Sequence, residues 1–151
     1  MQNIKKINDE IAVATNQLTP EDLQQAAQAG YRTVLNLRSP HEEGVLPEEQ
    51  QYAEAAGLQY VNIPVKPDSL NQELADQVLQ QIEQSPKPVL AHCKSGLRSG
   101  AMALMYVATC EGISAQEAMQ RGQQMGFDCS ANPAMKKFFE DYVTTDFQRS
   151  Q

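Results

Sequence analysis

Hydrophobic and polar residues alternate along the chain in blocks that predict strands and helices in turn. Short apolar segments rich in strand-forming residues are separated by longer polar segments with apolar residues at helical spacing. The expected strands are Glu10–Thr15, Tyr31–Arg38, Leu58–Ile63 and Val89–His92. An alternation of strand and helix predicts an α/β fold, with a central, mostly parallel sheet of short strands flanked by helices.

Capping residues and glycines mark the expected helix ends. In Thr19-Pro20-Glu21-Asp22 a capping threonine precedes a proline and two acids, and Gly30 supplies the stop. Further helices are expected from Pro47, after the caps Asn71 and Ser114, and from Asn132-Pro133. The last of these should turn an apolar set inward: Met135, Phe138, Phe139, Tyr142 and Val143. The segment Ala101–Ala108 is apolar almost all round, which predicts a central buried helix.

The composition narrows the class of protein. The chain has 151 residues, 41% of them hydrophobic, which suits one domain over residues 1–151 with a short tail after about residue 144. The net charge of −7 argues against a nucleic-acid partner, since such proteins usually carry a basic surface. No segment predicts a signal peptide or a membrane span, and three cysteines fit a reducing compartment. We therefore expect a cytoplasmic protein with no membrane partner.

A loop bearing a cysteine and an arginine follows the expected strand Val89–His92. It reads His92-Cys93-Lys94-Ser95-Gly96-Leu97-Arg98-Ser99. A thiol attacks usefully as a thiolate, and a free thiol with a pKa of about 8.5 is mostly protonated at neutral pH. Cys93 directly precedes an expected helix, whose free N–H groups and dipole favour an anion. Arg98 adds a permanent cation, and Ser99 can donate a hydrogen bond to the sulfur.

The same loop can hold a tetrahedral anion. Gly96 allows the backbone to curl so that successive N–H groups point inward, and the Arg98 fork matches two oxygens of a phosphate-like group. We interpret Cys93 as the nucleophile and Arg98 as the residue that binds the transferring group. His92 is expected to orient the loop through a backbone hydrogen bond rather than to act as a base. The expected substrate-binding residues are His92, Lys94, Ser95, Gly96, Leu97 and Ser99.

The pattern His92-Cys93-x-x-Gly96-x-Arg98-Ser99 resembles the signature loop of the cysteine-dependent phosphatases of the tyrosine and dual-specificity superfamily. More closely, the chain resembles the bacterial beta-lactamase hydrolase-like, phosphatase-like family. The segments that carry this resemblance besides the loop are Leu18–Leu23, Gly30–Arg38 and Ala56–Val65. The resemblance implies a dual-specificity-phosphatase-like fold and hydrolysis of phosphomonoesters, in proteins or small aryl phosphates, through a cysteinyl-phosphate intermediate. It implies no metal or other cofactor.

The spacing in this loop leaves two other functions open. Four residues separate Cys93 from Arg98, whereas the phosphatase loop usually has five. Four is also the spacing in many rhodanese-type sulfurtransferases, in which the cysteine carries a persulfide. A third interpretation is a non-catalytic sensor that binds an anion or a sulfur species and signals through a partner.

Phosphoester cleavage needs a proton donor for the leaving oxygen, whereas persulfide transfer does not. Asp68 is the first candidate, because related phosphatases place an aspartate on the loop after the corresponding strand. Its place between Pro67 and Ser69 also suits a turn or capping residue. The alternatives lie on an earlier loop and are His41, Glu42 and Glu43.

Three further residues have open or structural interpretations. Arg38 could contact the substrate or form an ion pair at a strand end. Cys110 lies in the apolar helix and is expected in the core. Cys129 could be a redox partner of Cys93, although nothing in the sequence places the two close together.

Overall fold

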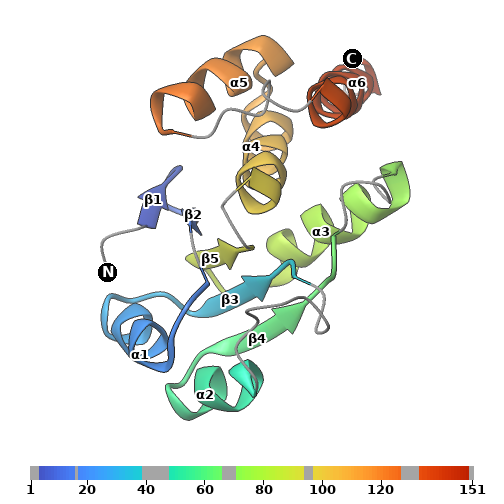
Figure 1. Ribbon diagram of the computed structural model, residues 1–151. Helices are drawn as coiled ribbons and strands as arrows, with labels where there is room; N and C mark the ends of the chain where they lie inside the picture. The colour runs from blue at the N-terminus through green and yellow to red at the C-terminus, as the bar shows by residue number, and fades with distance from the viewer. Residues whose placement is uncertain are drawn as a thin grey trace.

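A five-stranded sheet in the order β1-β2-β5-β3-β4 forms the centre of the protein (Figure 1). The structure is a computed structural model that describes residues 4–15, 17–38, 48–65, 71–93, 97–126 and 133–149, without the side chains of residues 97, 98 and 146–149. The strands are β1 (Ile4–Lys6), β2 (Ile11–Ala14), β3 (Thr33–Asn36), β4 (Gln59–Asn62) and β5 (Val89–His92). Only β1, an edge strand, pairs antiparallel, so the predicted α/β fold with a mostly parallel sheet is confirmed.

The helices cover both faces of this sheet. They are α1 (Pro20–Gln28), α2 (Glu49–Ala55), α3 (Gln72–Gln84), α4 (Leu97–Glu111), α5 (Ala115–Gln124) and α6 (Pro133–Arg149). Helices α1 and α2 lie on one face, and α3 to α6 lie on the other (Figure 1). Helix α6 continues to Arg149, so residues 145–149 are helical, where a tail is expected from the sequence.

Each inner strand sends alternate side chains into two different cores. Along β2, Ile11 and Val13 belong to the larger core around α4, whereas Ala12 and Ala14 belong to the smaller core under α1 and α2. In β5, Leu90 joins the smaller core. Successive side chains of a strand point to opposite faces of the sheet. His92, the last residue of β5, and Cys93, which follows it, must therefore face different layers.

Helix α4 is the buried centre of the larger layer, as its uniformly apolar sequence predicts. Every residue from 101 to 108 is at most 3% exposed. Helices α3, α5 and α6 and the strands β2 and β5 all contact it. The expectation that Cys110 lies in the core is wrong: its side chain is exposed. Cys110 falls near the end of α4, just past the apolar segment, where the helix leaves the core.

Side-chain caps define three of the helix starts as the sequence predicts. Thr19 Oγ1 accepts a hydrogen bond from the Asp22 N–H at 3.1 Å, and Asp22 Oδ2 accepts one from the Thr19 N–H at 3.0 Å. Asn71 Oδ1 and Ser114 Oγ cap α3 and α5, each by accepting one hydrogen bond from the main-chain N–H three residues later. Gly30 adopts a φ of 100° after α1, a conformation that favours glycine.

Removing the Thr19 cap should weaken the fold measurably. Thr19→Ala is expected to lower the free energy of unfolding by about 1 kcal/mol, since the Asp22 N–H loses its acceptor. Urea denaturation followed by circular dichroism measures the effect. Gln24→Ala, at an exposed position of α1, is the matched control and should change stability little. An equal effect in both variants would mean that the cap contributes nothing.

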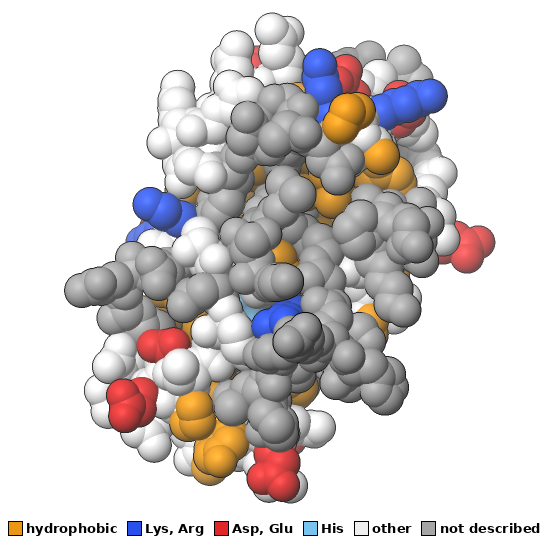
Figure 2. Space-filling view, in the orientation of Figure 1, with side chains coloured by type: hydrophobic (Ala, Val, Ile, Leu, Met, Phe, Trp, Pro, Cys, Tyr) orange, Lys and Arg blue, Asp and Glu red, His pale blue; other side chains and the backbone are white. Residues whose placement is uncertain are grey.

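The described surface is mixed in character. On the face shown in Figure 2, acidic and basic side chains are scattered among uncharged ones, without a continuous basic stripe among the described side chains. Within the described part of the chain, no helix has the length and apolar character needed to cross a membrane.

Candidate active site

The carboxyl ends of four parallel strands meet along one edge of the sheet. The in-register pairing of β2, β5, β3 and β4 brings Ala14, His92, Asn36 and Asn62 into one row. In open parallel sheets, ligands bind beyond this edge. The chain continues from these ends into Thr15, Cys93, Leu37 and Ile63. This edge is therefore the place to look for the site.

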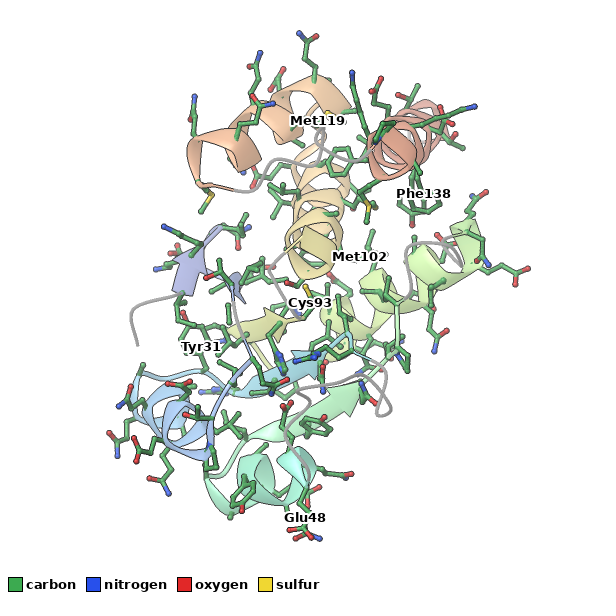
Figure 3. All side chains as sticks on the ribbon, viewed as in Figure 1. Tyr31, Glu48, Cys93, Met102, Met119 and Phe138 are labelled. Carbon is green, nitrogen blue, oxygen red and sulfur yellow. The ribbon has the colours of Figure 1, made fainter. Side chains whose placement is uncertain are left out.

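Cys93 lies between the end of β5 and the start of α4 (Figure 3). Its side chain has no exposed surface. The Ser99 N–H, in the first turn of α4, donates a hydrogen bond to Cys93 Sγ at 3.4 Å, and Ser99 Oγ lies 3.4 Å from the same sulfur. Ser99 is also fully buried. Because a main-chain N–H points at the sulfur from a helix start and a hydroxyl lies within the same reach, the arrangement favours negative charge there.

Several residues predicted from the sequence lie outside the described residues. For Leu97 and Arg98 the structure describes only the backbone, which begins α4. The predicted residues that fall outside the described chain are Lys94, Ser95, Gly96, Asp68, His41, Glu42, Glu43 and Cys129.

The His92 ring makes a contact that the sequence does not predict. Its Nε2 lies 2.7 Å from Glu49 Oε2, and the two side chains are 0% and 2% exposed. Glu49 is the first residue of α2, so it reaches His92 from the layer opposite Cys93. We expect from the sequence a hydrogen bond from the ring to the backbone; the structure shows a buried contact with a carboxylate instead. His92 comes two residues after Leu90 in β5, so its side chain lies on the same face of the sheet, which α1 and α2 cover.

Arg38 belongs to the same polar layer. Its side chain is 2% exposed, and its Nη1 donates to Gln17 Oε1 at 2.8 Å. Gln17 Nε2 in turn donates to Glu49 Oε1 at 2.6 Å. These contacts and its burial make Arg38 part of the frame beneath the strand ends, through a neutral amide; they test neither the expected ion pair nor a contact with substrate.

Asn36 and Tyr60 extend this layer across the sheet. Asn36 Oδ1 accepts from the Arg38 N–H at 2.9 Å, and Asn36 Nδ2 donates to the Tyr60 hydroxyl at 2.9 Å. Burial raises the pKa of Tyr60 to about 12; the hydrogen bond from Asn36 opposes the shift, and the charge and hydrogen bond of Glu49 add to it. Tyr60 therefore stays protonated at neutral pH and can donate to a carboxylate.

A family comparison agrees with this arrangement. Residues 3–109 match the model of the family described as "Beta-lactamase hydrolase-like protein, phosphatase-like domain". The chain belongs to this family. The matched residues include β1 to β5, Cys93, Ser99 and Glu49, so the strand edge and the polar layer beneath it both lie within the phosphatase-like domain.

Relatives and solved structures agree with this assignment. A beta-lactamase hydrolase-like protein from Xylella fastidiosa is 35% identical over 95% of this chain, but the chain spans only 38% of that relative's length. A structure described as a "putative phosphatase" from Neisseria meningitidis is 26% identical, covers 94% of this chain and 99% of its own, and has a TM-score of 0.79. TpbA from P. aeruginosa, solved in complex with pTyr, is 16% identical, with coverage of 97% and 89% and a TM-score of 0.79. The fold is therefore that of the tyrosine and dual-specificity phosphatases.

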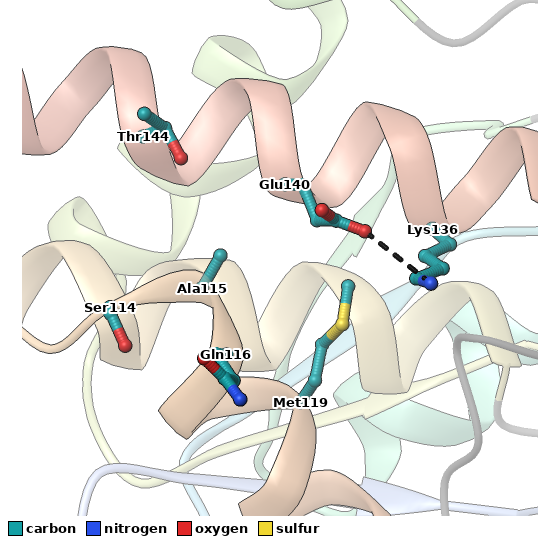
Figure 4. A pocket seen from close by; sticks show the side chains of 7 residues that line it. All are labelled: Ser114, Ala115, Gln116, Met119, Lys136, Glu140 and Thr144. Atoms are coloured by element: carbon teal, nitrogen blue, oxygen red, sulfur yellow. Dashed lines mark ion pairs between the residues drawn. The ribbon is translucent and has the colours of Figure 1, made fainter.

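A hollow lies apart from the strand ends of the phosphatase-like domain. It has a volume of about 460 Å³ and lies between α5 and α6 (Figure 4). Its charged side chains, Lys136 and Glu140, pair at 3.9 Å and are each about half exposed. The other lining residues are Ser114, Ala115, Gln116, Met119 and Thr144. This set contains no cysteine or histidine, and no cluster of metal-ligating side chains occurs in the described part of the chain.

The polar residues beneath the strand ends were missed by reasoning from sequence. Glu49 follows Pro47-Glu48 and looks like an ordinary acid in the first turn of a helix. Gln17 lies in a polar segment and has no motif around it. Their partners are distant in the chain: 43 residues separate Glu49 from His92, and 32 separate Gln17 from Glu49. Only the topology of the sheet brings them together.

Proposed function

We propose that the phosphatase-like domain hydrolyses phosphomonoesters with Cys93 as its nucleophile. The observation that carries this proposal is the sulfur of Cys93 at the end of a central strand, with the N–H and the hydroxyl oxygen of Ser99 both 3.4 Å away. A thiolate held in this way is the species that attacks. Family membership and the phosphatase fold support the same reaction.

The proposed reaction has two steps. The Cys93 thiolate attacks phosphorus, forming an S–P bond while the P–O bond to the leaving group breaks. Asp68 gives its proton to the departing oxygen, and Arg98 and the loop N–H groups stabilise the transferring oxygens. Water then attacks the cysteinyl phosphate, its proton passes to the Asp68 carboxylate, and the S–P bond breaks to release phosphate and the thiolate. His92, Lys94, Ser95, Gly96, Leu97 and Ser99 shape the loop that binds the phosphoryl group.

The proposed substrates are phosphorylated side chains of the phosphotyrosine or phosphoserine kind, or small aryl phosphates. The complex of TpbA with pTyr supports the first of these, since TpbA shares the fold. A phenoxide is the better leaving group of the two types, so an aryl phosphate is the substrate of choice for a first assay. A cytoplasmic site of action is part of the proposal, and no metal is required.

Sulfur transfer is the second candidate, because four residues rather than five separate Cys93 from Arg98. In that reaction Cys93 would take the outer sulfur of thiosulfate as a persulfide, releasing sulfite, and pass it to cyanide as thiocyanate. No proton donor for an alkoxide is needed, so Asp68 would be dispensable. The two reactions therefore differ in their dependence on one residue.

A paired assay with Asp68→Asn separates these reactions. The purified chain is offered an aryl phosphate and, separately, thiosulfate with cyanide. If the domain is a phosphatase, we expect phosphate release that Asp68→Asn lowers by about 10²- to 10⁴-fold, the range for loss of a general acid. Asp76→Asn, in α3, is the control for an aspartate outside the site.

Two results would overturn the phosphatase proposal. Thiocyanate production that Asp68→Asn leaves unchanged, without phosphate release, would identify a sulfurtransferase. Turnover of neither substrate, together with measurable phosphate binding, would identify an anion sensor. Phosphate release that is unaffected by Asp68→Asn would retain the phosphatase but remove Asp68 as its acid.

A further inference from the structure

The buried polar layer fixes the direction of each of its hydrogen bonds. An arginine side chain can only donate, so Gln17 Oε1 must accept from Arg38. The Gln17 amide N–H₂ group therefore faces the other way. It donates to the Leu18 carbonyl at 3.0 Å and to Glu49 Oε1 at 2.6 Å. The Leu18 carbonyl can only accept, so the contact with Leu18 requires Nε2 of Gln17 on that side, just as the contact with Arg38 requires Oε1 on the other. The two contacts therefore assign the same orientation to the Gln17 amide.

The same reasoning assigns the donors and acceptors in the hydrogen bonds of Glu49 and His92. An ionised carboxylate only accepts, so Glu49 accepts from Gln17 at one oxygen and must accept from His92 at the other. Nε2 of His92 therefore carries a proton. In the neutral ring, Nδ1 is then an acceptor. It has no hydrogen-bond partner among the described residues, although it is fully buried.

Glu49 contacts this ring directly, and two further charged or titratable groups lie behind Glu49 in the same hydrogen-bond network. Helix α2 supplies Glu49, β4 supplies Tyr60, and the end of β3 supplies Arg38 through the neutral Gln17. The Tyr60 hydroxyl accepts from Asn36, so its own proton is available to Glu49. Gln17 donates to the Glu49 carboxylate directly, while Arg38 donates to Gln17 and so fixes the direction of that hydrogen bond.

We propose that Glu49 is a positioning residue for the reaction, and that it holds the His92 ring in one orientation, with the proton on Nε2 and with Nδ1 as the acceptor. This inference rests on the proposed function of Cys93. The ring belongs to the residue immediately before the nucleophile, at the end of the strand that carries it. A buried, charge-assisted contact at 2.7 Å fixes both the rotation of the ring and its tautomer. The strand end that carries Cys93 is thereby held from the opposite side of the sheet.

Glu49→Gln tests this inference, because glutamine has the same shape but only one acceptor. Gln17 still donates, so the oxygen of Gln at position 49 must face Gln17, and its N–H₂ group must face His92. Nε2 of His92 would then have to accept, and the ring proton would move to Nδ1. The matched control is Glu54→Gln, at an exposed position of the same helix.

The tautomer can be read directly by NMR of the ¹⁵N-labelled protein. The chain has two histidines, and His41→Ala assigns the signals of the other. Spectra are recorded from about pH 6 to about pH 9, which brackets the ordinary titration of histidine. We expect an Nε2 proton on neutral His92 in the unaltered chain and in Glu54→Gln, and an Nδ1 proton in Glu49→Gln. For hydrolysis of an aryl phosphate, we expect Glu49→Gln to lower kcat by about 10- to 100-fold, the range seen when a carboxylate that orients a metal-binding histidine is replaced, with KM little changed.

Each contrary result has a distinct meaning. An Nδ1 proton on neutral His92 in the unaltered chain, or protons on both nitrogens over the whole range, would overturn the inference even if no variant folds. Retention of the Nε2 proton in Glu49→Gln would do the same. A change of tautomer without a change in kcat would remove the positioning role. Absence of hydrolysis in the unaltered chain would refute the proposed function, while the spectra would still decide whether Glu49 sets the tautomer.

Discussion

Cys93→Ser is expected to lower the rate of phosphate release by at least about 10³-fold, the scale seen when a catalytic nucleophile is removed. A serine hydroxyl remains protonated at neutral pH. The Ser99 N–H, 3.4 Å from the sulfur, favours an anion but cannot by itself ionise a hydroxyl. Initial rates with an aryl phosphate measure the loss, and mass spectrometry after acid quenching should detect a phosphorylated Cys93 in the unaltered chain.

Cys110→Ser is the matched control for this substitution. Cys110 lies in the same helix whose first turn contacts Cys93, but its side chain is exposed. We expect this variant to retain the activity of the unaltered chain. If Cys93→Ser hydrolysed the substrate as fast as Cys110→Ser does, Cys93 would not be the nucleophile, and both the phosphatase and the sulfurtransferase mechanisms would fail.

Phe139→Ala should produce the largest loss of stability. Phe139 is fully buried in α6 and belongs to the core around α4. Deleting a buried aromatic side chain removes its transfer free energy and leaves a cavity, which together cost about 3–5 kcal/mol. Urea denaturation measures the change. Lys137→Ala, two residues away on the exposed surface of α6, should change the free energy of unfolding by less than about 0.5 kcal/mol.

The same experiment tests whether the chain is one domain. The family match ends at residue 109, before α5 and α6, yet both helices contact α4. If all 151 residues form one cooperative unit, Phe139→Ala should shift a single unfolding transition that is the same for every probe. A separate early transition of α5 and α6, with the rest of the chain as stable as before, would contradict a single domain.

Much of the fold could be predicted from the sequence because its determinants are local. Thr19, Asn71 and Ser114 cap helices through contacts only three residues away. The apolar segment around Leu104 could be placed at the centre because no face of it is polar. Strand β1 was not predicted: it has three residues, two of them lysines, and only its pairing with β2 makes it a strand.

The candidate site likewise contains contacts that could be predicted from the sequence and contacts that could not. Cys93 and Ser99 are six residues apart and share a loop pattern, so their contact was expected. The Glu49–His92 contact could not be predicted, because it depends on α2 packing beneath β5 and on the parity of one strand. The exposure of Cys110 was missed for a related reason. Its helix is long enough to leave the core, and sequence periodicity does not show where the neighbouring layer ends.

The pairing of β5 with its two neighbours decides which side chains at its end face which layer of the protein. A slip of one residue along β5 would exchange the faces of His92 and Cys93, placing the thiol against a carboxylate and the imidazole in the apolar core. Strand β5 is protected against such a slip because it pairs along its length with β2 on one side and β3 on the other. Insertions or deletions in the edge strand β1 leave this arrangement untouched, whereas a one-residue change in β4 would turn Tyr60 away from Asn36. Length changes should therefore be tolerated in β1 and should abolish function in β5.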